Sequence, residues 1–114
     1  MAINYNLSKV YALSDNDSEF VIQILTLFVR EVPQDIKNIG IGINEKDYKI
    51  AYAYAHKIKP TLDLLGMTIA YDEVLQIESW TIAEGKRKEI AATFESIKNQ
   101  VEKAIKEIKK DFEI

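Results

Sequence analysis

Residues 55–66 read AHKIKPTLDLLG, and they lie inside the helical pattern that predicts the central helix of the fold. Apolar residues recur along one side of this helix at intervals of three and four, namely Ala51, Ala55, Ile58, Leu62 and Leu65. At ~100° per residue, His56 falls roughly 140° from the centre of that stripe. We therefore expect the only histidine of the chain to point to solvent, with Lys59 and Asp63 on the same side.

The residues before the central helix predict a short helix followed by a long one. A short helix is expected over residues 7–13, and a long helix is expected where apolar residues keep the helical period over residues 20–39. Pro33 interrupts the long helix, because proline removes one backbone hydrogen bond. Gly40 and Gly42 are expected to end it, since glycine is the usual residue at a left-handed cap.

Two further helices are expected after the central one. Gly66 marks the end of the central helix or a point of close approach. The inward positions of the next helix are predicted to be Ile69, Ala70, Val74, Ile77 and either Trp80 or Thr81. Gly85 is the next break, and residues 86–112 carry the most regular apolar stripe of the chain. The sequence thus predicts one all-α domain over residues 1–114, an antiparallel four-helix bundle with a short additional N-terminal helix.

Composition excludes several classes of function. The chain has 114 residues, 47% hydrophobic and 29% charged, which is ordinary for a folded domain. The absence of cysteine excludes disulfides and thiolate metal sites, and a single histidine argues against a zinc site. A net charge of −3 argues against nucleic acid as a partner. There is no signal peptide pattern and no apolar run of ~20 residues, so a cytoplasmic protein without membrane attachment is expected.

The central stretch resembles the active-site helix of histidine-containing phosphotransfer (HPt) domains, which act in multistep phosphorelays. Family members carry a small residue before the histidine, an aliphatic residue at +2, a lysine at +3 and a glycine at +10. The matching residues here are Ala55, Ile58, Lys59 and Gly66. Members often have an aliphatic–acidic pair in the next helix, where this chain has Ile77 and Glu78.

Two residues depart from the family pattern. The family usually has a small residue directly after the lysine, which lets the receiver domain approach the histidine, and this chain has Pro60 there. Asp63 is unexpected as well, because a carboxylate repels a phosphoryl group. It either orients Lys59 through an i to i+4 ion pair or meets a basic residue of the partner.

The resemblance implies a role for each residue of the stretch. His56 would accept the phosphoryl group and Lys59 would stabilise it, because phosphoryl transfer is mostly positioning and charge neutralisation. Gly66 would permit close approach of the receiver domain. The residues expected at the binding surface are Tyr52, Ala55, Pro60, Asp63, Gly66 and Met67.

The resemblance also implies the partners. Response-regulator receiver domains and a hybrid histidine kinase would exchange phosphate with the chain, and the receiver would bring the aspartyl phosphate and Mg²⁺. The chain itself would bind no cofactor or metal and would be a monomeric carrier without turnover, hence no enzyme. The initial methionine favours a complete small protein over a domain cut from a hybrid kinase.

Two alternatives come from other functional classes. One is a pseudo-phosphotransfer adaptor that binds receiver domains without carrying phosphate, which Pro60 and Asp63 keep open. The other is a structural helical bundle whose partner is another amphipathic helix.

Overall fold

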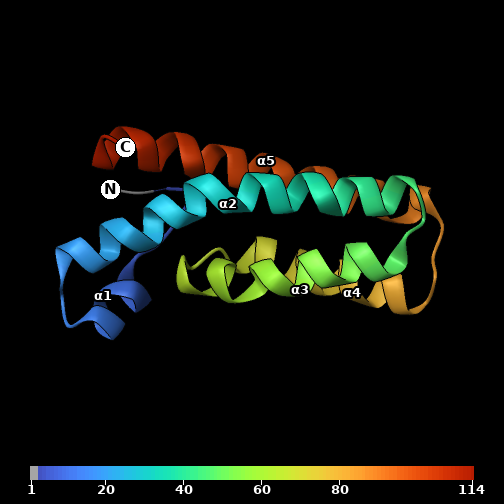
Figure 1. Cartoon of the computed structure of the whole chain (residues 1–114), viewed down its shortest axis with the longest axis horizontal. Coiled ribbons are helices and arrows are strands. Elements are labelled where there is room, and N and C mark those ends of the chain that lie inside the picture. The colour runs from blue at the N-terminus through green and yellow to red at the C-terminus, as the bar shows by residue number, and fades with distance from the viewer. Residues whose placement is uncertain (1–2) are drawn as a thin grey trace.

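Residues 3–114, which the computed structural model describes, form five helices and no strand. The helices are α1 (Ser8–Ser14), α2 (Ser18–Asn44), α3 (Tyr48–Leu64), α4 (Thr68–Ile82) and α5 (Arg87–Phe112). The last four lie along the long axis of the molecule, each antiparallel to the next, and α1 lies beside the first part of α2 (Figure 1). The predicted antiparallel four-helix bundle with a short additional N-terminal helix is therefore confirmed.

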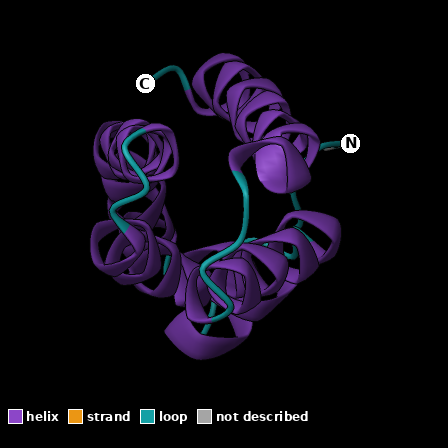
Figure 2. Cartoon of the chain, turned by 90° about the vertical axis from the view of Figure 1, so that its right-hand side faces the viewer, coloured by secondary structure: helices purple, strands orange, loops and turns teal. Residues whose placement is uncertain are grey.

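The four long helices form a closed ring around the core. Each packs against the next in the chain, and α5 closes the ring by packing against α2, as the end-on view shows (Figure 2). The side of the bundle where α3 meets α4 is therefore opposite the side where α2 meets α5. We call these two sides the α3–α4 face and the α2–α5 face.

Short turns separate the helices. The carboxylate of Asp17 caps α2 by accepting hydrogen bonds from the backbone N–H groups of Glu19 and Phe20. Asp47 caps α3 by accepting from the N–H of Ile50 at 3.2 Å. Gly66 follows α3 with a φ of +64°, a left-handed conformation that glycine adopts without strain. The predicted helix end at Gly66 is confirmed.

The predicted end of α2 at Gly40 and Gly42 is wrong, because the helix continues through both glycines to Asn44. A Cβ atom at Gly42 would lie 2.8 Å from the backbone nitrogen of Ala51. At Gly40 the nearest atom would be the ring of Phe94, at 2.9 Å. The glycines thus serve helix packing, since they let α3 and a side chain of α5 approach the backbone of α2.

Both prolines lie inside helices. Pro33 is in α2, whose first part slopes away from the line of the remainder (Figure 1). This bend has a direct cause, because a proline removes one helical hydrogen bond and its ring pushes against the preceding turn. Pro60 is in α3, which nevertheless continues to Leu64.

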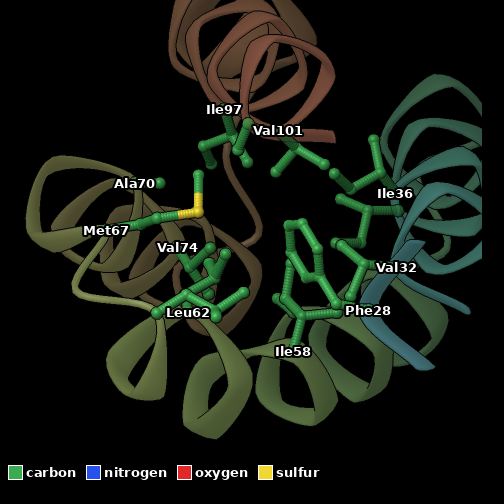
Figure 3. Close-up of a cluster of buried hydrophobic side chains, with 14 of the residues drawn as sticks. Phe28, Val32, Ile36, Ile58, Leu62, Met67, Ala70, Val74, Ile97 and Val101 are labelled. Atoms are coloured by element: carbon green, nitrogen blue, oxygen red, sulfur yellow. The ribbon is translucent and has the colours of Figure 1, made fainter. Parts of the chain in front are cut away.

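Apolar side chains from all four long helices fill the centre of the ring (Figure 3). The labelled members of this core are Phe28, Val32, Ile36, Ile58, Leu62, Met67, Ala70, Val74, Ile97 and Val101. Each fully buried Phe, Leu, Ile or Val side chain stabilises the fold by about 1.5–3 kcal/mol. The predicted inward stripe of α3, from Ala51 to Leu65, is buried throughout.

The prediction for α4 needs one correction. Ile69 is 68% exposed instead of inward, because it lies in the first turn of the helix next to the buried Ala70. Trp80 and Thr81, which the pattern left as alternatives, are both buried. Their polar groups are satisfied locally: the Trp80 indole N–H donates to the carbonyl of Lys86 at 2.8 Å, and the Thr81 hydroxyl donates to the carbonyl of Glu78 at 2.6 Å.

Residues 3–6 connect the C-terminal part of α5 to the C-terminal end of α3. The N–H groups of Ile3 and Asn4 donate to the carboxylate of Glu107 in α5. The Tyr5 hydroxyl donates to Asp111 at 2.8 Å, and burial together with this carboxylate raises the pKa of the phenol. The N–H of Asn6 then donates to the carbonyl of Leu65 at 2.7 Å, directly after α3.

Candidate functional site

His56 stands on the outer side of α3, and 61% of its side chain is exposed. The apolar stripe of α3 faces the core, so the residue following Ala55 on the helix is turned outward. Tyr52, one turn earlier, stacks on the imidazole with ring centroids 5.7 Å apart and ring planes 9° from parallel. The histidine is thus accessible and supported on one side.

A buried carboxylate of α4, that of Glu78, is hydrogen-bonded to the imidazole. Glu78 is only 10% exposed at its side chain, and each of its two oxygens has a separate partner on α3. Oε2 lies 3.0 Å from Nδ1 of His56, and Oε1 lies 3.0 Å from Nζ of Lys59. One carboxylate therefore fixes both α3 side chains relative to each other and relative to α4.

This hydrogen bond decides which tautomer of His56 is present. An ionised carboxylate can only accept hydrogen bonds, so the neutral ring carries its hydrogen on Nδ1. The other ring nitrogen, Nε2, then has a free lone pair. Nε2 is therefore the ring nitrogen that is chemically able to act as a nucleophile.

Lys59 supplies the positive charge of the site. Its side chain is 20% exposed, and the hydrogen bond to Glu78 raises the pKa of its ammonium group against the opposing effect of desolvation. The group therefore stays charged at neutral pH. An ammonium ion has three N–H donors, so the bond to Glu78 leaves two for another acceptor.

Two other charged residues of α3 are paired away from His56. Asp63 forms a 2.7 Å ion pair with Lys9 of α1, while Lys59 pairs with Glu78. Of the two roles considered for Asp63, orienting Lys59 is therefore excluded. Lys57 forms a 2.9 Å ion pair with the buried Asp35 of α2, which raises the pKa of the lysine.

The expected binding surface is only partly exposed. Tyr52 and Pro60 are exposed close to His56 in the sequence of α3. Ala55 and Met67 are buried in the core, so placing them at an exposed docking surface was wrong. Both lie on the inward side of the bundle, where Ala55 is small enough for close packing of α3.

Gly66 is required by the fold of the chain itself. A Cβ at this position would lie 2.7 Å from the Cβ of Asn6, so the open space beside the glycine is taken by the chain's own N-terminal segment. Its requirement for glycine comes from the positive φ and from this contact. Close approach of a receiver domain at Gly66 stays a prediction.

Comparison with known families decides what this helical bundle is. The family model of the Hpt domain matches residues 23–111, a range that contains the four long helices almost entirely and all three residues of the site. The chain belongs to the Hpt domain family. No curated protein and no solved structure matches it significantly. Membership suggests phosphotransfer in two-component signalling, where Hpt domains interact with receiver domains and histidine kinases.

The sequence analysis of this Hpt domain missed Glu78 as a member of the site. Glu78 entered only as half of the aliphatic–acidic pair of α4, although a signal was present. It lies four residues after Val74 and three before Thr81, both buried, so the helical period places a carboxylate on the inward side. A charge at an inward position requires a charged partner, and α3 supplies Lys59.

Neither a metal-ligand cluster nor a membrane-spanning helix is found among residues 3–114. Within residues 3–114, no group of three or more histidine and carboxylate side chains is arranged to hold a metal. None of the helices over those residues is both long and apolar enough to cross a bilayer.

Proposed function

We propose that this Hpt domain is a phosphoryl carrier in a two-component phosphorelay, with His56 as the phosphorylated residue. The observation that carries the proposal is the arrangement in which Glu78 holds Nδ1 of His56 and Nζ of Lys59 at 3.0 Å each. It presents one activated nitrogen and one positive charge on an exposed part of the α3–α4 face. Receiver domains of response regulators and of a hybrid histidine kinase are the proposed partners.

The transfer step uses the free lone pair of Nε2. This nitrogen attacks the phosphorus of an aspartyl phosphate, a P–N bond forms, and the P–O bond to the aspartate breaks with its electron pair leaving on the carboxylate. The ring keeps its hydrogen on Nδ1 and becomes positively charged. Glu78 stabilises that charge through the existing hydrogen bond, because its carboxylate is negative. Transfer to a second receiver is the reverse step.

Lys59 has its effect on the phosphoryl oxygens. Phosphoryl transfer passes through a loose transition state, so catalysis consists of positioning and neutralising charge. The free N–H donors of Lys59 are placed for this, because Glu78 keeps the ammonium beside the imidazole. Mg²⁺ would be bound by the receiver domain, and the carrier has no turnover of its own.

The decisive experiment is intact-mass spectrometry after the protein is mixed with Mg²⁺-loaded, phosphorylated receiver domains. We expect a gain of one phosphoryl group that is acid-labile and base-stable and that maps to His56. The His56→Gln variant is the control and should gain nothing. Label on another residue, or label that remains in the variant, would contradict the assignment.

An adaptor that binds receivers without carrying phosphate is the second candidate, and Pro60 favours it. Pro60 lies one helical turn after His56. It has no backbone N–H, whereas a small residue at this position would have one. An adaptor would bind receivers with equal affinity before and after the His56→Gln substitution and would never be labelled. A carrier would be labelled by at least one cognate receiver.

A further inference from the structure

The α2–α5 face holds a long groove that is separate from the site at His56. Two adjoining hollows of about 510 and 500 Å³ form it, and they share Pro33, Glu102 and Ile105. It extends on α2 from Pro33 to Asn44, which at a rise of ~1.5 Å per residue corresponds to about 16 Å. We call this hollow surface the α2–α5 groove.

The floor of the groove is apolar. Its apolar lining residues are Ile36, Gly40, Ile41, Phe94, Val101 and Ile105. Gly40 has no side chain, and the ring of Phe94 occupies the space beside it. Ile41 is 43% exposed at the edge of the floor, so apolar surface is left in contact with water.

The rim of the groove is positively charged. Four lysines line it, Lys37, Lys98, Lys103 and Lys106, against the single carboxylate of Glu102. None of these four lysines forms an ion pair with a carboxylate of residues 3–114. This local excess of positive charge stands out in a chain whose net charge is −3. The rim therefore favours a negatively charged partner.

We propose that the α2–α5 groove binds an acidic amphipathic helix of a protein partner. A groove between two neighbouring helices accepts the ridge of side chains on a third, and about 16 Å corresponds to about three helical turns. The apolar face of the partner helix would cover the floor, and its flanking Asp and Glu residues would face the lysines. Because the groove is opposite the α3–α4 face, His56 stays accessible while the groove is occupied.

The test is an NMR titration of the ¹⁵N-labelled full chain with a synthetic 15-residue helical peptide. The probe has leucine at positions i, i+3, i+4 and i+7 and glutamate beside them, and a second probe has lysine in place of each glutamate. We expect saturable shifts of residues 33–44 and 94–106 with the glutamate probe, weakened by added salt. The residues around His56 should not shift, and the lysine probe should bind at least about tenfold more weakly.

Two double variants complete the design. Lys37→Glu/Lys98→Glu should weaken the glutamate probe at least about tenfold. Lys88→Glu/Lys109→Glu changes the net charge equally outside the groove and should have little effect. Thermal unfolding of both variants checks that the fold is kept. Phosphotransfer by either variant should match that of the unsubstituted chain.

Three outcomes would overturn the proposal. They are equal binding of both probes, shifts that map outside the groove, and no binding of either probe. Shifts of the groove residues caused by phosphatidylserine vesicles but not by peptide would assign the groove to a lipid surface instead. Each outcome leaves the test of His56 phosphorylation unaffected, because that test uses another face and another partner.

Discussion

The α3–α4 face and the α2–α5 face differ in whether their charged side chains are paired. On the α3–α4 face, Glu78 pairs with both His56 and Lys59, so the side chains that face one another are fixed. On the α2–α5 face, four lysines surround an apolar floor and none of them is paired within residues 3–114. Fixed geometry suits a reaction at one atom, whereas unpaired charge beside apolar surface suits the binding of another molecule.

The helices α3 and α5 also pack against α2 differently. Gly42 faces the backbone of α3, and that helix approaches so closely that a Cβ has no room. Gly40 faces only the end of the Phe94 side chain of α5, beside the groove. The junction of α2 with α3 is therefore tight, and the junction with α5 is looser.

The largest expected effect is on phosphoryl labelling, which should depend on the α3–α4 face and not on the α2–α5 face. His56→Gln should abolish phosphoryl labelling completely, because the nucleophilic nitrogen is lost, whereas Lys98→Gln on the α2–α5 face should leave labelling unchanged. The His56 side chain is mostly exposed but donates to the buried carboxylate of Glu78, so the free energy of unfolding should fall by about 0.5–1.5 kcal/mol. Mass spectrometry and urea unfolding measure the two quantities. Loss of labelling in both variants would show that the faces are not independent.

The second effect concerns the carboxylate that holds the site. Glu78→Ala should slow transfer to His56 roughly tenfold to a hundredfold, since a hydrogen bond to a charged group contributes about 1.5–3 kcal/mol. Glu78→Gln should recover part of the rate, because its amide oxygen can still accept from Nδ1. A time course of labelling by one phosphorylated receiver domain, with samples quenched at intervals, gives the rates.

A positioning role for Glu78 also predicts a readout that general loss of stability would not change. The tautomer ratio of His56, read from the ¹⁵N chemical shifts of its imidazole, should move away from the Nδ1–H form in Glu78→Ala, because no carboxylate then accepts from Nδ1. An unchanged tautomer ratio would leave Glu78 with a packing role only.

The third effect compares the two glycines of α2. Gly42→Ala should lower the free energy of unfolding by about 1–3 kcal/mol, because the new Cβ meets the backbone of Ala51. Gly40→Ala should change it by less than about 1 kcal/mol, since the Phe94 ring lies beside the groove and can move while alanine favours the helix. Urea unfolding of both variants measures the difference. Equal losses would mean that α5 is held as tightly as α3.

The smallest effect is a dependence of stability on alkaline pH. The ion pairs with Asp35 and Glu78 raise the pKa values of Lys57 and Lys59 above the usual 10.5. Stabilisation by a group with a raised pKa is complete below its unfolded value and is lost as pH rises through the folded value. Stability should therefore fall above about pH 10.5, and less so in Lys59→Gln. Urea unfolding between pH 8 and 12 tests this, and equal slopes for both proteins would remove Lys59 from the explanation.

The helices and the buried stripe of α3 could be predicted from the sequence, because both follow from a local period. The position of His56 followed in the same way, since an outward angle on a helix needs only the positions of its apolar neighbours. Hydrogen-bond caps at helix ends are also local, which is why the turn at Gly66 was found.

Contacts between helices could not be predicted by the same reasoning. A glycine signals either a helix end or a close approach, and only the neighbouring helix decides, as Gly40 and Gly42 illustrate. Asp63 had a plausible partner one turn away in Lys59, but Lys9 of another helix pairs with it. Glu78 joins the site for the same reason, because its partners are on α3. Its inward place on α4 was the one usable signal.

Pro60 has a consequence for the backbone of the very residue that we expect to carry phosphate. A proline has no N–H, so the carbonyl oxygen of His56, four residues earlier in α3, loses its helical donor. A backbone acceptor of this kind requires water or a donor from another molecule. A docked receiver that excludes water at this turn must therefore donate a hydrogen bond to the main chain of His56 or leave that carbonyl unsatisfied. Main-chain recognition would then contribute to partner choice beside the imidazole itself.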